Sequence, residues 1–191
     1  MRFSYWSAIG AAAASIGYGV AQILQVIGVL PDPVDRIAIF APSLALAPFF
    51  VATLAAAHEA APEGYRTQRM AALALGVLYA GLVSLVYVNQ LGVVIPHDIA
   101  GTGEGYARLA CCGFREPMTA IDLLGYTYMS LALLLLAPGT RGLLRWSLLA
   151  NGALAVPVFL QLFWPALIWV AAPWLVTFPV SMLLLAASFR R

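Results

Sequence analysis

Residues Ile37–Ala57 read IAIFAPSLALAPFFVATLAAA and contain no charged side chain. A run of about 20 apolar residues is long enough to cross the hydrocarbon core of a bilayer as an α-helix. Inside lipid, every backbone amide needs an internal hydrogen-bond partner, which a helix supplies within a single segment. The stretch therefore predicts a transmembrane helix, and the rest of the chain can be divided by the same pattern.

Five further apolar segments lie on either side of this one. They predict six spans joined by short loops, at residues 5–30, 37–57, 70–95, 118–137, 143–163 and 166–189. Only Trp164-Pro165 separates the last two spans. An unbroken helix from Leu143 to Phe189 would be about 70 Å long, more than twice the hydrocarbon thickness. We therefore expect a tight hairpin at Pro165 and one domain over residues 1–191.

The composition agrees with an all-α integral membrane protein, a bundle of about six transmembrane helices. Of 191 residues, 63% are hydrophobic and only 9% are charged, and the mean hydropathy is +0.91. A soluble domain carries roughly 25% charged residues, so most of this surface must face something other than water. The sequence lacks the strand-like alternation of a transmembrane barrel.

The arginines set the expected orientation through the positive-inside rule. With the N-terminus placed inside, the inner segments hold Arg2, Arg66, Arg69, Arg141, Arg145, Arg190 and Arg191. The outer segments hold only Arg36, Arg108 and Arg115. We therefore expect a multi-pass protein of the inner (plasma) membrane with both termini in the cytoplasm. The Ala- and Arg-rich composition without Lys further suggests a GC-rich bacterial source.

Missing residues argue against several cofactor classes. The chain has no Lys, so neither retinal nor pyridoxal phosphate can form a Schiff base with it. The two histidines, His58 and His97, fall at opposite membrane faces, so they cannot ligate one haem between them. No basic run is typical of a nucleic-acid-binding patch. We expect no cofactor and no nucleic-acid partner.

The longest loop, residues 96–117, is expected on the outer side and holds the two cysteines, Cys111 and Cys112. Adjacent cysteines rarely bridge each other and no third cysteine exists, so a disulfide scaffold is not expected. A metal site that combines them with His97 and Asp98 matches no standard ligand spacing, and no metal is predicted. We expect a flexible loop with a short surface helix near residues 106–112.

Asp122 is the only acidic residue well inside a predicted span, about 7 Å from its outer end at helical rise. Ionisable groups at such depth usually face protein or water. Thr119, Tyr126 and Ser130 share its helix face. Two alternatives follow for Asp122. It pairs with Arg36, which begins the second span at the same membrane face, or it is protonated within the polar stripe.

Other spans carry single polar stripes, and these share one level in the membrane. In the expected topology the outer half contains Gln22, Gln25, Tyr87, Asn89, Gln90, Asp122, Tyr126 and Gln161. This coincidence suggests a polar cavity that opens outward and binds a ligand through these residues. The alternative is that the amides only hydrogen-bond neighbouring helices and fix their packing.

Three functions are compatible with these features. The first is a non-enzymatic membrane protein that binds a small or lipidic ligand in the outer-half cavity, for sensing or transport. The second is an accessory or scaffold subunit that contacts a membrane protein partner or a second copy of itself within the lipid bilayer. The third is an intramembrane enzyme that uses Asp122, which would require a second reactive group close to that carboxyl group.

Overall fold

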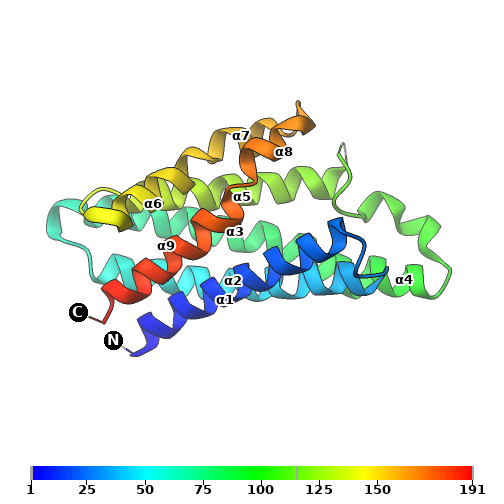
Figure 1. Ribbon diagram of the computed structural model, residues 1–191, viewed down its shortest axis with the longest axis horizontal. Coiled ribbons are helices and arrows are strands. Elements are labelled where there is room, and N and C mark those ends of the chain that lie inside the picture. The colour runs from blue at the N-terminus through cyan, green and yellow to red at the C-terminus, as the bar shows by residue number, and fades with distance from the viewer. Residues whose placement is uncertain (1, 115, 191) are drawn as a thin grey trace.

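The computed structural model describes residues 2–114 and 116–190, and helices cover all six predicted spans. Arg115 and Arg191, two of the arginines used for the orientation, lie outside the described residues. No strand occurs in the described ranges. The main helices are α1 (Arg2–Val26), α2 (Val34–Glu59), α3 (Arg66–Asn89), α5 (Pro117–Leu136), α6 (Gly142–Ala153), α7 (Ala155–Leu160), α8 (Ile168–Ala171) and α9 (Trp174–Ser188) (Figure 1).

The third span is longer than the sequence predicts. After α3 the helix continues through a π-helical turn, η2 (Gln90–Val94), into α4 (Ile95–Ile99). The helical segment from Glu63 to Ile99 contains 37 residues, about 55 Å at helical rise. Its far end therefore projects beyond the neighbouring helices (Figure 1). The first span, in contrast, ends at Val26 and not at Leu30.

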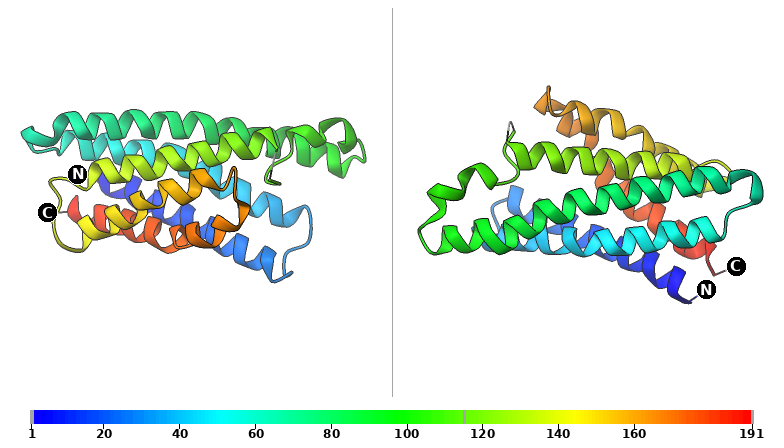
Figure 2. Two further views of the ribbon diagram at one scale, coloured as in Figure 1. Left: turned by 90° about the horizontal axis from the view of Figure 1, so that it is seen from above. Right: turned by 180° about the vertical axis from the view of Figure 1, so that it is seen from behind.

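The connection from α4 back to α5 crosses the same end of the bundle. It contains the 3-10 helix η3 (Gly103–Leu109), so the expected short surface helix is present a few residues earlier than predicted. We call residues 95–114 the cap segment. The two termini lie side by side at the end of the bundle opposite the cap segment, as Figures 1 and 2 show.

Proline breaks the last two spans at defined places. Pro157 has no N–H to donate to the Ala153 carbonyl, and α6 ends at Ala153. Pro173 likewise separates α8 from α9. Between α7 and the short 3-10 helix η4 (Pro165–Leu167) the chain reverses, and α9 returns along α6. The predicted hairpin at Pro165 is therefore confirmed.

The six spans form a closed ring. Each packs against its neighbour in chain order, α1 on α2, α2 on α3, α3 on α5, α5 on α6 and α7, and α6 on α9, and α9 closes the ring against α1. The centre is filled by large buried side chains, among them Phe50, Tyr79, Tyr87, Tyr126, Met129, Trp174 and Phe178. The ring therefore has a packed aromatic interior.

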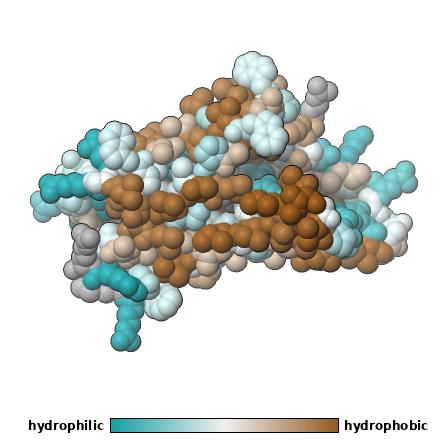
Figure 3. All heavy atoms as spheres, viewed as in Figure 1, coloured by the Kyte–Doolittle hydropathy of each residue, from teal (hydrophilic) through white to brown (hydrophobic). Residues whose placement is uncertain are grey.

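The outside of the ring is apolar along its length. Large hydrophobic side chains are exposed on several spans, including Val77, Leu85, Leu143, Trp146 and Val156. Figure 3 shows hydrophobic residues running along one face and hydrophilic residues gathered towards the two ends. Six helices are long and apolar enough to cross a membrane, and a contiguous apolar exterior suits contact with lipid.

Candidate functional site

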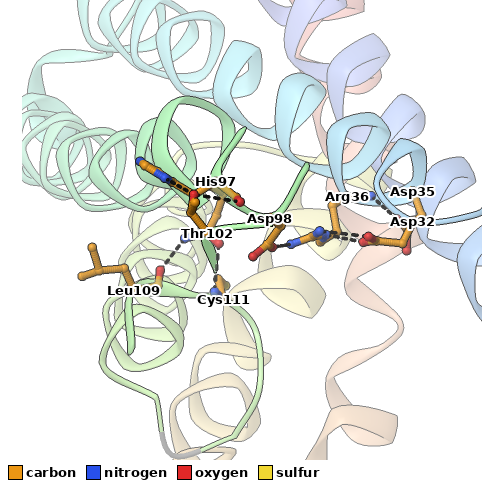
Figure 4. A network of polar contacts seen from close by, with 9 residues as sticks. Asp32, Asp35, Arg36, His97, Asp98, Thr102, Leu109 and Cys111 are labelled. Carbon is orange, nitrogen blue, oxygen red and sulfur yellow. Dashed lines mark hydrogen bonds and ion pairs between the residues drawn. The ribbon is translucent and has the colours of Figure 1, made fainter. Parts of the chain in front are cut away.

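The cap segment is held against the ring by two polar side chains. Gln90 is almost fully buried in η2; its Nε2 donates to the Leu109 carbonyl at 2.7 Å, and its Oε1 accepts from the Cys111 N–H at 3.0 Å. Figure 4 shows Leu109 and Cys111 at this contact. On the other side, the Thr119 hydroxyl donates to the Gly113 carbonyl at 2.7 Å. The stretch between these contacts is therefore fixed from η2 and from α5.

An ion-pair network holds the start of the cap segment as well. The Arg36 guanidinium, near the start of α2, lies 2.6 Å from an Asp98 carboxylate oxygen and also pairs with Asp32 (Figure 4). The alternative in which Arg36 pairs with Asp122 is therefore wrong. Because the third span continues as helix into α4, it brings Asp98 to Arg36.

The two cysteines lie between these anchoring contacts. A disulfide bond joins Cys111 to Cys112, so the expectation that adjacent cysteines stay unbridged is wrong here. The bond links neighbours in the sequence and crosslinks no distant segments. Cys112 is exposed at the surface, whereas Cys111 is half-buried over the ring.

Asp122 lies directly beneath the cysteine pair. The two sulfur atoms and a carboxylate oxygen of Asp122 all lie within 4.8 Å of one another. The Oδ1 atom of Asp122 is buried without a hydrogen-bond partner among the described residues. The second reactive group that an enzyme using Asp122 requires is thus close to it, and it consists of two sulfur atoms.

A chain of hydroxyl groups leads from Asp122 into the ring. The Tyr87 hydroxyl lies near the Asp122 carboxyl group and donates to the Tyr126 hydroxyl at 2.9 Å. The Tyr126 ring in turn packs edge-on against Tyr79 and Trp174, with ring centroids 5.8 and 5.1 Å away. Asp122 is therefore lined on its inner side by aromatic side chains.

The eight predicted site residues separate into two groups. Gln90, Asp122, Tyr87 and Tyr126 converge beneath the cysteine pair, as described above. Gln22 lies near Tyr18 on α1, and Gln25 donates to the Asp35 carboxylate at 2.7 Å. The other two are Asn89, half-buried and bonded to the Leu85 carbonyl of its own helix, and Gln161, buried near the end of α7.

One cavity adjoins the start of α5. It has a volume of about 270 Å³ and is lined by Phe114, Glu116, Pro117, Thr119, Ala120, Leu123 and Leu162. A second cavity at the opposite end is lined by Arg2, Tyr5, Trp6, Phe189 and Arg190. None of the eight predicted residues lines either cavity, and the predicted ligand-binding role of these residues stays a prediction.

Reasoning from the sequence omitted the cysteines from the site. Their position in the sequence could have identified them. A cysteine pair shortly before a predicted span can fold back over a carboxyl group near the start of that span. Tyr18, Tyr79 and Trp174 also lie in the cluster, and only the order of helices around the ring identifies them. Comparisons with protein families, with curated proteins and with solved structures found no match to this chain.

Proposed function

We propose that the protein is a membrane thiol–disulfide oxidoreductase, in which Cys111 and Cys112 exchange disulfides with a thiol substrate and Asp122 transfers the proton. The observation that carries the proposal is the approach of both sulfur atoms to the Asp122 carboxyl group, within 4.8 Å. This corresponds to the third sequence-based alternative, an enzyme that uses Asp122.

The proposal includes a location. We propose that the termini lie in the cytoplasm and the cap segment on the outer face of a bacterial plasma membrane, an orientation that the arginine distribution favours. Disulfides persist in such an oxidising compartment, whereas cytosolic thiols are kept reduced. An outward-facing cysteine pair would meet secreted or membrane proteins with thiols or disulfides of their own.

The surroundings of the two cysteines favour different roles. Cys112 is exposed, so its sulfur can be reached by a substrate. Cys111 is half-buried beside Asp122 and is fixed through its backbone by Gln90. The thiolate and not the thiol is the nucleophile in disulfide exchange. A neighbouring carboxylate that accepts the Cys111 proton would therefore activate the Cys111 sulfur for attack.

The exchange with a substrate disulfide takes two steps. The Cys112 thiolate attacks one substrate sulfur, a mixed disulfide forms, and the other substrate sulfur leaves as a thiolate that takes up a proton from water. Cys111 then gives its proton to Asp122 and attacks the Cys112 sulfur. The second substrate sulfur leaves as a thiolate and takes up the proton from Asp122, which returns to its carboxylate form. The substrate gains two electrons and two protons, and the Cys111–Cys112 disulfide is formed. Run in reverse, the same steps oxidise a substrate dithiol.

The cavity beside α5 supports the proposal. It has room for part of a substrate, and it lies next to Thr119, which holds the Gly113 end of the stretch that contains the cysteines. Its lining is mixed, with apolar Phe114, Leu123 and Leu162 and the carboxyl group of Glu116. A binding role without chemistry remains compatible with this cavity, and the redox experiment below distinguishes the two.

The test uses the purified protein in detergent. The chain contains only these two cysteines, so a maleimide mass tag reports the state of the pair directly. The protein is equilibrated with mixtures of reduced and oxidised glutathione, and the untagged and doubly tagged forms are quantified. We expect reversible interconversion with a defined midpoint. A pair that stays in one state across all mixtures would contradict the proposal.

A further inference from the structure

The same three side chains that the proposed exchange uses have the composition of a soft-metal site. Cys111 and Cys112 offer one sulfur each and Asp122 offers a carboxylate oxygen, and all three ligand atoms lie within 4.8 Å of one another. Ligand atoms that share one tetrahedral Zn²⁺ lie about 2.0–2.3 Å from it, so they lie about 3.3–3.8 Å from one another. Once the Cys111–Cys112 disulfide is reduced, the two sulfur atoms can separate to this spacing, with the Asp122 carboxylate already near them.

We propose that the reduced form of the protein binds a thiophilic divalent cation, such as Zn²⁺ or Cd²⁺, through Cys111, Cys112 and Asp122. The inference rests on the proposed function in one respect, namely that the pair can be reduced. Thiolates select soft and borderline metals, whereas carbonyl and carboxylate sets select Mg²⁺ and Ca²⁺. Two thiolates and one carboxylate carry three negative charges, of which a divalent cation offsets two.

The surroundings also point to a ligand. The Asp122 Oδ1 atom is buried without a hydrogen-bond partner among the described residues. A buried polar atom in this condition costs free energy, and coordination to an ion would satisfy it. Gln90 and Thr119 fix the backbone on both sides of the cysteines, so the donor set is held in place before an ion arrives.

Three protein ligands leave a fourth position of a tetrahedral ion free. Cys112 is exposed, so water or a substrate atom could reach an ion held by it. The site would also depend on redox state. In the disulfide the two sulfurs are bonded to each other and neither is a thiolate, so oxidation of the pair releases the ion.

The first experiment uses the wild-type chain alone. The protein is reduced with a phosphine, separated from the reductant and titrated with Cd²⁺, whose thiolate complexes absorb in the ultraviolet; a second sample is oxidised beforehand. We expect one Cd²⁺ per reduced chain, none per oxidised chain, and no competition from a large excess of Mg²⁺. Equal binding by the two forms would overturn the proposal.

The second experiment tests the ligand set. Cys111→Ser and Cys112→Ser should each abolish the thiolate absorption of a two-sulfur site, and Asp122→Asn should weaken Cd²⁺ binding by at least about tenfold. Glu104→Gln, which changes an exposed carboxylate in the cap segment, is the matched control and should bind as the wild type does. Wild-type affinity in Asp122→Asn would overturn the three-ligand site.

Failure of this inference is distinguishable from failure of the proposed function. The glutathione equilibrium is measured with a chelator present, so it needs no metal, and the Cd²⁺ titration uses a chemical reductant, so it needs no exchange activity. A pair that exchanges disulfides and binds no Cd²⁺ contradicts only the metal site. A pair that binds Cd²⁺ and exchanges nothing contradicts only the oxidoreductase.

Discussion

The side-chain amide of Gln90 hydrogen-bonds the backbone on both sides of Ala110: it donates to the Leu109 carbonyl at 2.7 Å and accepts from the Cys111 N–H at 3.0 Å. One side chain of α3's continuation thus fixes the backbone of the reactive pair, although it lies some 20 residues earlier in the chain. Gln90 is therefore a positioning residue, since it acts on the cysteines through their backbone.

Replacement of Gln90 by Leu should disturb the cysteine pair. The change leaves the Leu109 carbonyl and the Cys111 N–H without partners, at a cost of about 1–3 kcal/mol in the free energy of unfolding. In the reduced protein, alkylation of Cys111 should become faster as the backbone loosens, and re-formation of the disulfide should become slower. Both rates are measured by mass tagging.

The matched control for this change is Asn89→Leu. Asn89 is the preceding residue, is half-buried, and donates to the Leu85 carbonyl of its own helix. The Asn89→Leu substitution should leave the rate of Cys111 alkylation and the rate of disulfide re-formation unchanged. Equal rates in Gln90→Leu and wild type would show that the amide contact does not position the pair.

Removal of the Tyr79 hydroxyl and removal of the Tyr87 hydroxyl should affect the stability of the protein differently. Tyr79 is fully buried and its hydroxyl has no partner among the described residues, so Tyr79→Phe should be at least as stable as wild type. Tyr87 donates to Tyr126, so Tyr87→Phe should lose about 0.5–1.5 kcal/mol. Denaturation of both variants in detergent checks the order, and the reverse order would contradict the described hydrogen bonding.

Arg36→Gln should loosen the cap segment and leave the ring intact. The Arg36 side chain is 21% exposed and that of Asp98 is 35% exposed, so the pair should contribute no more than about 1 kcal/mol. Hydrogen exchange should accelerate in α4 and η3. A double-mutant cycle with Asp98→Asn should give a small positive coupling energy, whereas a coupling of zero would mean that the ion pair contributes nothing to holding the cap segment.

Two glycines should differ sharply in their tolerance of alanine. A Cβ added at Gly152 would lie 2.9 Å from the Leu134 Cα, so Gly152→Ala forces α5 and α6 apart and should destabilise the bundle by about 1–3 kcal/mol. A Cβ at Gly81 meets nothing within 4 Å, so Gly81→Ala should be neutral or slightly stabilising. Thermal unfolding of the pair in detergent checks the contact between these helices.

The proposed orientation can be tested independently of the chemistry. In intact cells treated with a permeant reductant, a membrane-impermeant maleimide should label Cys111 or Cys112 from outside. A cysteine introduced at Thr67, in a variant without the native pair, should be labelled only after the membrane is opened. The opposite pattern would move the cap segment and the site to the cytoplasmic side.

The sequence predicted the spans well because each one depends on its own composition. Ile37–Ala57 is apolar over its whole length, which predicts a helix without reference to the rest of the chain. The hairpin at Pro165 was predictable because one helix through both of the last two spans would be longer than a bilayer is thick. The helix ends were less predictable. The third span continues from Ile95 to Ile99 in α4, where Asp98 meets Arg36 across the bundle end, and that contact joins residues 62 positions apart.

The site was predictable only in part, because it depends on contacts between residues that are far apart in the sequence. In the expected topology Gln90, Asp122, Tyr87 and Tyr126 share one level along the bundle, and this level can be counted along each predicted helix. Which neighbour each side chain meets depends on the order of helices around the ring. Gln25 lies at a similar depth, yet it bonds Asp35, because the turn after α1 brings α2 back against it.

The most direct measurement is the rate at which oxidised glutathione re-forms the Cys111–Cys112 disulfide in the reduced protein, compared between wild type, Asp122→Asn and the control Glu104→Gln. A positioned proton acceptor contributes roughly 10²–10⁴-fold to a rate. The account predicts that Asp122→Asn slows the second step by about 100-fold or more, so that the mixed disulfide accumulates, while Glu104→Gln matches wild type. An Asp122→Asn rate within twofold of wild type, with no accumulated mixed disulfide, would contradict it.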